Sequence, residues 1–134
     1  MKKLITVCMV TLALYGCDFV PQFYDNNEYL LLAEIEASSR LLHDECVDMH
    51  VDVLPRINIL YERAEVLTTY AFYQPQNDTV TEQVTIIADN ISELRNKYRQ
   101  DGVAPSDAYC KLKAETITVA SQRVLSTIGN KTRK

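Results

Sequence analysis

The stretch HDECVDMHVD, from His43 to Asp52, holds the residues best suited to bind a metal ion. On a helix, His43, Cys46 and His50 share one face, because spacings of three, four and seven residues return to the same side. Imidazole nitrogens and a thiolate are ligands that suit zinc and copper. One hypothesis for the chain is therefore a carrier of a metal ion or small ligand that uses the face from His43 to His50.

Other features of the sequence argue against this hypothesis and against catalysis. A second ligand pair such as CxxC or HExxH does not occur, and the carboxylates of the stretch lack the spacing of an EF-hand loop. Both histidines of the chain lie in this one stretch, and neither a nucleophile elbow nor a phosphate-binding loop accompanies them. We therefore predict that the chain is not an enzyme and has no catalytic residues, metal site or cofactor.

The elements that would position these residues are helices, because apolar residues recur at helical spacing and no segment alternates with period two. Short connections separate the apolar segments, which is typical of an up-down bundle. We predict an all-α, up-down-up-down four-helix bundle. Its expected helices span residues 27–49, 53–73, 79 to about 100, and 106–128.

Polar residues mark where three of these helices begin. Asp25 followed by Glu28 has the spacing of a capping box, and so has Thr79 followed by Glu82. Asp52 can cap the second helix through its side chain.

The N-terminal segment has the layout of a secretory signal peptide. Lys2 and Lys3 precede 13 uncharged residues, Leu4 to Gly16. A helix of that length measures about 20 Å, which is short of the ~30 Å needed to span the hydrocarbon of a bilayer. We therefore expect residues 1–16 to be removed rather than to form a permanent membrane span.

The end of this segment, Leu14-Tyr15-Gly16-Cys17, resembles the lipobox of bacterial lipoproteins. In that class the signal is cut before the cysteine, which then carries a diacylglyceryl group and an N-acyl chain. The resemblance implies lipidation of Cys17, a tether over residues 17–26, and a helical domain over residues 27–134. Asp18 after the cysteine implies retention in the inner membrane, as in enteric bacteria. The alternative is a plain secreted protein cleaved near Gly16.

The lipoprotein resemblance also sorts the four cysteines. Cys8 leaves with the signal and Cys17 takes lipid, so Cys46 and Cys110 remain as an even pair in an oxidising compartment. We predict a disulfide between them, since the end of the first helix and the start of the fourth meet at one pole of an up-down bundle. The alternative is two buried free thiols.

The remaining features bear on the partner. Loss of Lys2 and Lys3 with the leader changes the net charge from −4 to −6. The sequence has no basic stripe with interleaved aromatic residues, so we expect no nucleic-acid partner. The cluster of Tyr70, Phe72 and Tyr73 is a binding patch, a cover over the bottom of the core, or a patch that touches lipid. The expected partners are membrane lipid, through the acylated Cys17, and another envelope protein. The sequence leaves the oligomeric state open.

The function expected from these features is that of a lipid-anchored envelope protein, facing the periplasm, that binds or modulates another protein. One version is an exclusion or immunity lipoprotein carried by a phage or plasmid, by analogy alone. The alternatives are the carrier that uses the His43–His50 face and a structural subunit of envelope assembly.

Overall fold

The computed structural model describes residues 24–48, 52–100 and 104–131. These residues form four helices and no strands, so the predicted fold class is confirmed. The helices are α2 (Asn26–Glu45), α3 (Leu54–Tyr73), α4 (Asp78–Arg99) and α5 (Asp107–Gly129).

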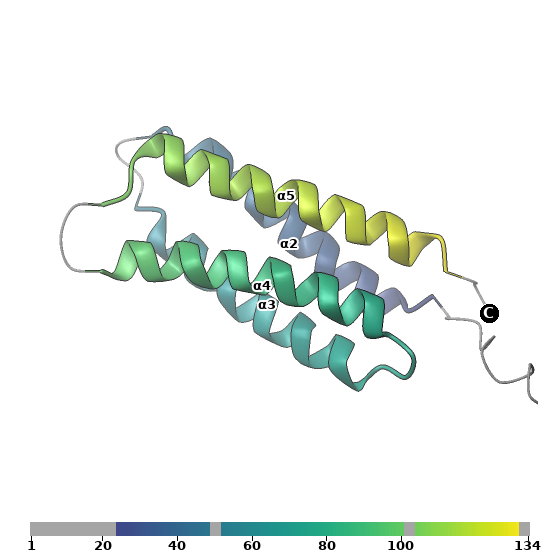
Figure 1. Ribbon diagram of the computed structural model, residues 1–134. Coiled ribbons are helices and arrows are strands. Elements are labelled where there is room, and N and C mark those ends of the chain that lie inside the picture. Colours follow the sequence, from purple (N-terminus) through teal and green to yellow (C-terminus); the bar gives the residue numbers. More distant parts are fainter. Residues whose placement is uncertain (1–23, 49–51, 101–103, 132–134) are drawn as a thin grey trace, which may run out of the picture.

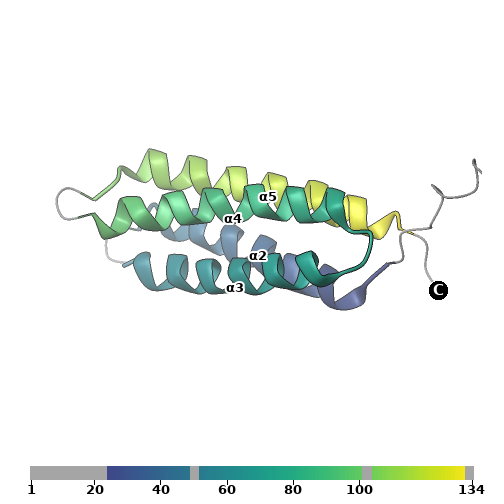
Figure 2. The same cartoon turned by 60° about the horizontal axis from the view of Figure 1, so that its bottom comes forward.

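Successive helices run antiparallel, which gives the predicted up-down-up-down order (Figure 1). α2 packs on α5 and α3, and α4 packs on α3 and α5. The view in Figure 2, turned by 60°, shows the same four rods side by side. The bundle therefore has two poles, and the start of α2 lies at the same pole as the end of α5. We call this the terminal pole, since Asp25 and Lys131 lie there, and the opposite end the disulfide pole.

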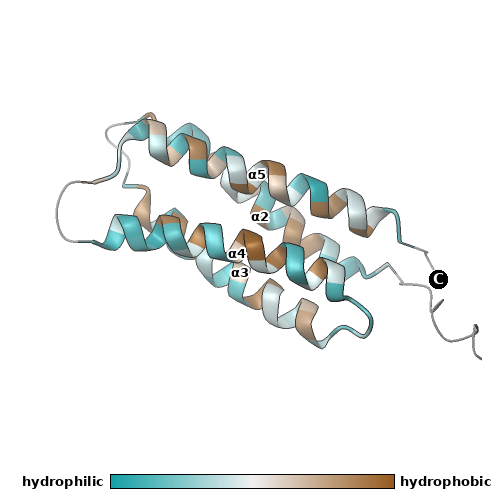
Figure 3. Ribbon diagram, in the orientation of Figure 1, coloured by the Kyte–Doolittle hydropathy of each residue, from teal (hydrophilic) through white to brown (hydrophobic). Residues whose placement is uncertain are grey.

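Aliphatic side chains with almost no exposed surface fill the space between the helices. In Figure 3 apolar residues recur along each helix between hydrophilic ones, as the 3.6-residue period requires. None of the described helices is both long and apolar enough to cross a membrane. The larger fully buried side chains of the core are Leu32, Ile35, Leu42, Ile57, Leu60, Leu67, Ile87, Ile91, Leu94, Ile117 and Ile128.

Small polar residues lie where α2 approaches α5. Ser39 is fully buried, and its hydroxyl is 2.7 Å from the Thr118 hydroxyl. Ser121 is also fully buried, and its hydroxyl has no hydrogen-bond partner among the described residues. Small side chains at these positions leave room for the two helices to pack closely.

Side-chain caps begin α2 and α5. Asp25 Oδ1 accepts the backbone N–H of Glu28 at 2.9 Å, and Ser106 Oγ accepts that of Tyr109 at 3.2 Å. Such caps satisfy backbone donors that have no partner within the helix. Half of the predicted capping box at Asp25 is thus present, but the side chain of Glu28 is directed elsewhere.

One predicted helix end is wrong, and one predicted capping box does not form. α2 ends at Glu45 rather than Met49, because Asp44, Glu45 and Asp48 would extend a row of negative charges along the negative end of the helix dipole. α4 begins at Asp78, and Asn77 at its N-cap makes no side-chain capping bond, so the capping box at Thr79 does not form. The cap predicted at Asp52 is close to correct, since its carboxylate accepts the N–H of Leu54 at 3.0 Å while Val53 is the N-cap residue.

Candidate functional site

The disulfide pole carries the cross-link that the sequence predicts. Cys46 and Cys110 form a disulfide with a Cα–Cα distance of 5.8 Å. Cys46 is the C-cap of α2 and Cys110 lies in the first turn of α5, and both side chains are buried. The alternative of two buried free thiols is therefore wrong.

His43 and Cys46, the two residues of the metal hypothesis that the structure describes, do not come together as ligands. The sulfur of Cys46 is consumed by the disulfide, so no thiolate is available. His43 is 40% exposed, and its Nδ1 lies 3.5 Å from the Asp44 carboxylate. His50 lies outside the described residues. Within the described ranges no three His, Cys, Asp or Glu residues are grouped as metal ligands.

His43 instead lines an open hollow of about 340 Å³ between α2 and α5. Arg40, Asp44, Glu115 and Thr118 line the rest of it. Its charged groups are of both signs, which gives the hollow no clear preference for a cation or an anion.

The terminal pole holds a buried polar network that the sequence analysis missed. Glu28 is fully buried in α2, and its carboxylate accepts a hydrogen bond from the amide of Asn77. Lys131 Nζ lies 3.3 Å from Glu28 Oε2 and donates to Asn77 Oδ1 at 2.6 Å. The Asn77 amide and the Thr81 hydroxyl also reach the carbonyl of Ala71 at the end of α3. This network joins α2, α3 and α4 to Lys131, which lies two residues after the end of α5.

A signal for the network is present in the sequence. Glu28 precedes Leu32 by four residues and Ile35 by seven, so it lies on the apolar stripe of α2. Lys131 follows Ile128 of the α5 stripe by three residues. A charged residue in line with buried ones is expected to find a partner, because an isolated buried charge is costly.

The aromatic residues at the end of α3 divide into two roles. Tyr70 is half-buried and donates its hydroxyl to the Asp25 carboxylate at 3.1 Å. Phe72 and Tyr73 are 70% and 78% exposed, and their rings stack edge to face at 5.3 Å between centroids. The interpretation as a core cover is therefore wrong for Phe72 and Tyr73, whereas Tyr70 is held at the terminal pole by its hydrogen bond to Asp25.

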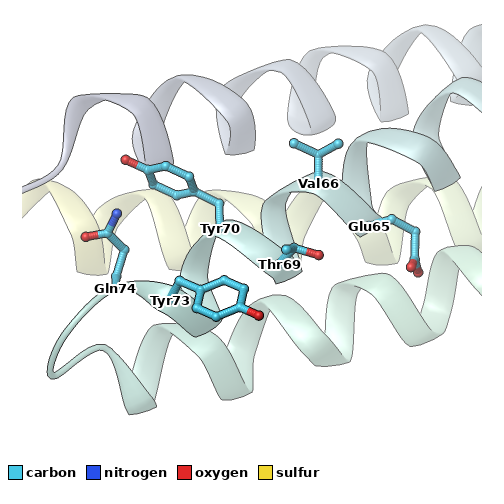
Figure 4. A pocket seen from close by; sticks show the side chains of 6 residues that line it. All are labelled: Glu65, Val66, Thr69, Tyr70, Tyr73 and Gln74. Carbon is cyan, nitrogen blue, oxygen red and sulfur yellow. The ribbon is translucent and has the colours of Figure 1, made fainter.

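An open hollow of about 500 Å³ lies on the outer side of α3. Figure 4 shows the rings of Tyr70 and Tyr73 at one end of it and Val66 with Glu65 at the other. Thr69 lies between them, and Gln74, the C-cap of α3, closes the aromatic end. This is a solvent-facing hollow whose surface is mainly apolar, not an enclosed ligand cavity.

A surface ion pair joins α4 to α5. Lys113 Nζ lies 2.6 Å from Glu93 Oε2, and the Tyr109 hydroxyl donates to Glu93 Oε1 at 3.4 Å. The hydrogen bond and the positive charge of Lys113 lower the pKa of the Glu93 carboxyl. Burial, followed by the charge of Glu93, raises the pKa of Tyr109. These groups connect two helices and border neither of the two hollows.

The lipidation predicted at Cys17, with Asp18 after it, lies outside the described residues. No protein-family model matches the chain, and no curated protein or solved structure shows significant similarity to it. The described features that bear on function are the exposed surface of α3, the disulfide at one pole and the buried network around Glu28 at the other.

Proposed function

We propose that the chain is a lipid-anchored protein of the bacterial envelope whose helical bundle binds or modulates another envelope protein. The observation that carries the binding role is the exposure of Phe72 and Tyr73 beside the hollow on α3. Monomeric soluble proteins seldom leave contiguous apolar surface in water unless it binds something. Aromatic side chains are also the commonest anchors of protein interfaces.

The anchoring role rests on the lipobox-like residues Leu14 to Cys17. Asp25 follows Cys17 by eight positions. Eight extended residues reach at most about 28 Å. A bundle tethered in this way would stay near the bilayer with its terminal pole toward the lipid, where the effective concentration for a membrane-bound partner is high.

The construction of the bundle suits a binding module. The disulfide links α2 to α5 at one pole, and the hydrogen bonds and ion pair around Glu28 link the ends of the described chain at the other. A surface held rigid before binding loses less conformational entropy when the partner docks. The carrier hypothesis has weaker support, because the disulfide removes the Cys46 thiolate from its ligand set.

Cross-linking in the native host followed by mass spectrometry tests this proposal. We expect the wild-type chain to fractionate with membranes and to capture one envelope protein reproducibly. A Cys17→Ser variant should lose the membrane fraction and most of that capture. A chain that stays soluble with Cys17 intact, or that captures only its own copies, would contradict the proposal; the second result would favour a structural subunit.

A further inference from the structure

α3 carries two apolar stripes, whereas a helix on a protein surface normally carries one. One stripe faces the core and consists of Ile57, Leu60, Ala64, Leu67 and Ala71. The other consists of Ile59, Val66 and Tyr73, which are 45%, 55% and 78% exposed. No described helix covers this second stripe.

The spacing of the outer stripe matches the surface that one helix offers to another. Ile59, Val66 and Tyr73 are seven residues apart, so they drift by only about 20° per step around the helix. The stripe is therefore nearly straight and about 21 Å long. The hollow of about 500 Å³ lies over its second half, between Val66 and Tyr73. A groove beside a line of apolar side chains at this spacing receives the side chains of a packed helix.

The charges beside the outer stripe are negative and unbalanced. Glu62 and Glu65 are exposed, and neither forms an ion pair within the described part of the chain. The two bases of α3 are directed to α2 instead. Arg56 binds Glu45 through two hydrogen bonds of 2.6 Å, and Arg63 donates to Ser38 at 2.6 Å.

The segment that follows, from the second half of α3 through most of α4, is also acidic. Between Arg63 and Arg95 it has five acidic residues and no lysine or arginine. Only one of the five, Glu93, forms an ion pair with a described residue. A partner that approaches the outer surface of α3 therefore meets a negative potential, which attracts cationic side chains.

We propose that the outer stripe of α3 docks an amphipathic helix of the partner protein, one whose apolar face is flanked by lysine or arginine. Its apolar side chains pack on Val66 and Tyr73, and its cations lie over Glu62 and Glu65. This inference rests on the proposed function, since it names the surface and the partner chemistry of that binding role.

Charge also disfavours two other occupants. A second copy of α3 packed antiparallel about Val66 would bring Glu65 of each copy close together, which is repulsive. An anionic bilayer would repel the same carboxylates. A cationic amphipathic helix is the occupant that satisfies both the apolar stripe and its charges.

Site-specific photo-cross-linking of the whole chain in its native host tests this proposal. A benzophenone amino acid is incorporated at Thr69, in the centre of the hollow, or at Val119 on α5. Val119 is a matched control because it is exposed and follows the exposed Leu112 by seven residues, while Lys111 and Lys113 lie beside that pair. We expect a protein adduct from the Thr69 probe and none of the same mass from the Val119 probe. The cross-linked peptide should carry apolar residues at helical spacing with lysine or arginine beside them.

Charge reversal provides the second measurement. Glu62→Lys/Glu65→Lys in the Thr69-probe chain should lower the adduct yield about fivefold or more, because like charges then face each other. Glu82→Lys/Asp89→Lys on α4 makes the same change in net charge and should lower the yield less than about twofold. Circular dichroism verifies that each variant is folded.

Four results would overturn the proposal. They are an adduct from Val119 but not from Thr69, a Thr69 adduct with lipid or a second copy, a cross-linked peptide that is acidic, and no adduct from either probe. The first leaves the proposed binding function standing, because the partner then docks elsewhere. Loss of capture in the general cross-linking experiment, by contrast, contradicts the function itself.

Discussion

Glu28 and Lys131 lie 103 positions apart in the chain, yet Lys131 Nζ is 3.3 Å from Glu28 Oε2 in the interior of the terminal pole. Their side chains are 1% and 6% exposed. Asn77 bonds to both of them, so the two ends of the described chain and the turn before α4 meet at one buried ion pair. The disulfide joins α2 to α5 at the opposite pole, so these two helices are linked at both of their ends.

Replacing Lys131 by methionine leaves the Glu28 carboxylate buried without its cation. We expect Lys131→Met to lower the free energy of unfolding by about 3 kcal/mol, measured by urea denaturation. The double variant Glu28→Gln/Lys131→Met should recover at least half of this loss, since the buried charge is then gone. Lys97→Met, at an exposed position of α4, should change stability by less than about 0.5 kcal/mol. A Lys131→Met variant as stable as the wild type would show that the pair is not buried in solution.

Removing the disulfide should destabilise the bundle through the unfolded state. The bridge closes a sequence separation of 64 residues. For a loop of that length the chain-entropy model gives roughly 4 kcal/mol. We expect Cys46→Ser/Cys110→Ser to lose about this amount in urea denaturation, and the wild type to lose a similar amount in dithiothreitol. The double variant should not respond to the reductant. Equal stability of the oxidised and reduced wild type would contradict the cross-link.

Gln76, in the turn between α3 and α4, has a positive φ of 58°. A Cβ in this region of the Ramachandran map costs about 1–2 kcal/mol, whereas glycine adopts it freely. We expect Gln76→Gly to stabilise the protein by about 0.5–1 kcal/mol, seen as a higher thermal midpoint. Gln74→Gly is the matched control, because Gln74 lies in the same connection with a φ of −75°. That change should be destabilising, since it only adds freedom to the unfolded chain. Destabilisation by both changes would indicate that Gln76 does not hold the positive φ.

The Glu93–Lys113 pair has a titration signature. Because Lys113 lowers the pKa of the Glu93 carboxyl, the pair contributes stability above the pKa of Glu93 in the unfolded chain. That contribution is lost as the pH falls through the lower pKa of the folded state. Carboxyl-carbon NMR should find Glu93 titrating below an ordinary glutamate, and Lys113→Met should raise this pKa. An unchanged Glu93 pKa in that variant would exclude the pair in solution.

Much of the fold follows from sequence pattern. The 3.6-residue recurrence of apolar side chains predicts four helices. The disulfide is predicted because Cys46 and Cys110 are the two cysteines that the lipobox interpretation leaves without another role. The end of α2 was predicted too far along the chain, because the apolar pattern continues to Met49. The helix itself ends at Glu45, where electrostatics disfavours further acidic residues.

The buried network was harder to predict. The spacing of Asp25 and Glu28 matches a capping box, which already gives the Glu28 side chain a local partner. Its actual partner, Lys131, lies 103 positions away, and no local pattern predicts it. The second stripe of α3 is present in the sequence as Ile59, Val66 and Tyr73. One apolar stripe already accounts for the core, and only the exposure of these side chains in the folded bundle shows that the other is uncovered.

We propose that lipid on Cys17 holds this bundle at a membrane, and the mass of the N-terminal peptide is the decisive test. The chain is purified from the membranes of its native host, digested with protease, and analysed by mass spectrometry. We expect the mature chain to begin at Cys17 and this residue to carry the mass of a diacylglyceryl group and an N-acyl chain. A mature chain that begins at another residue, or at an unmodified Cys17, would contradict it.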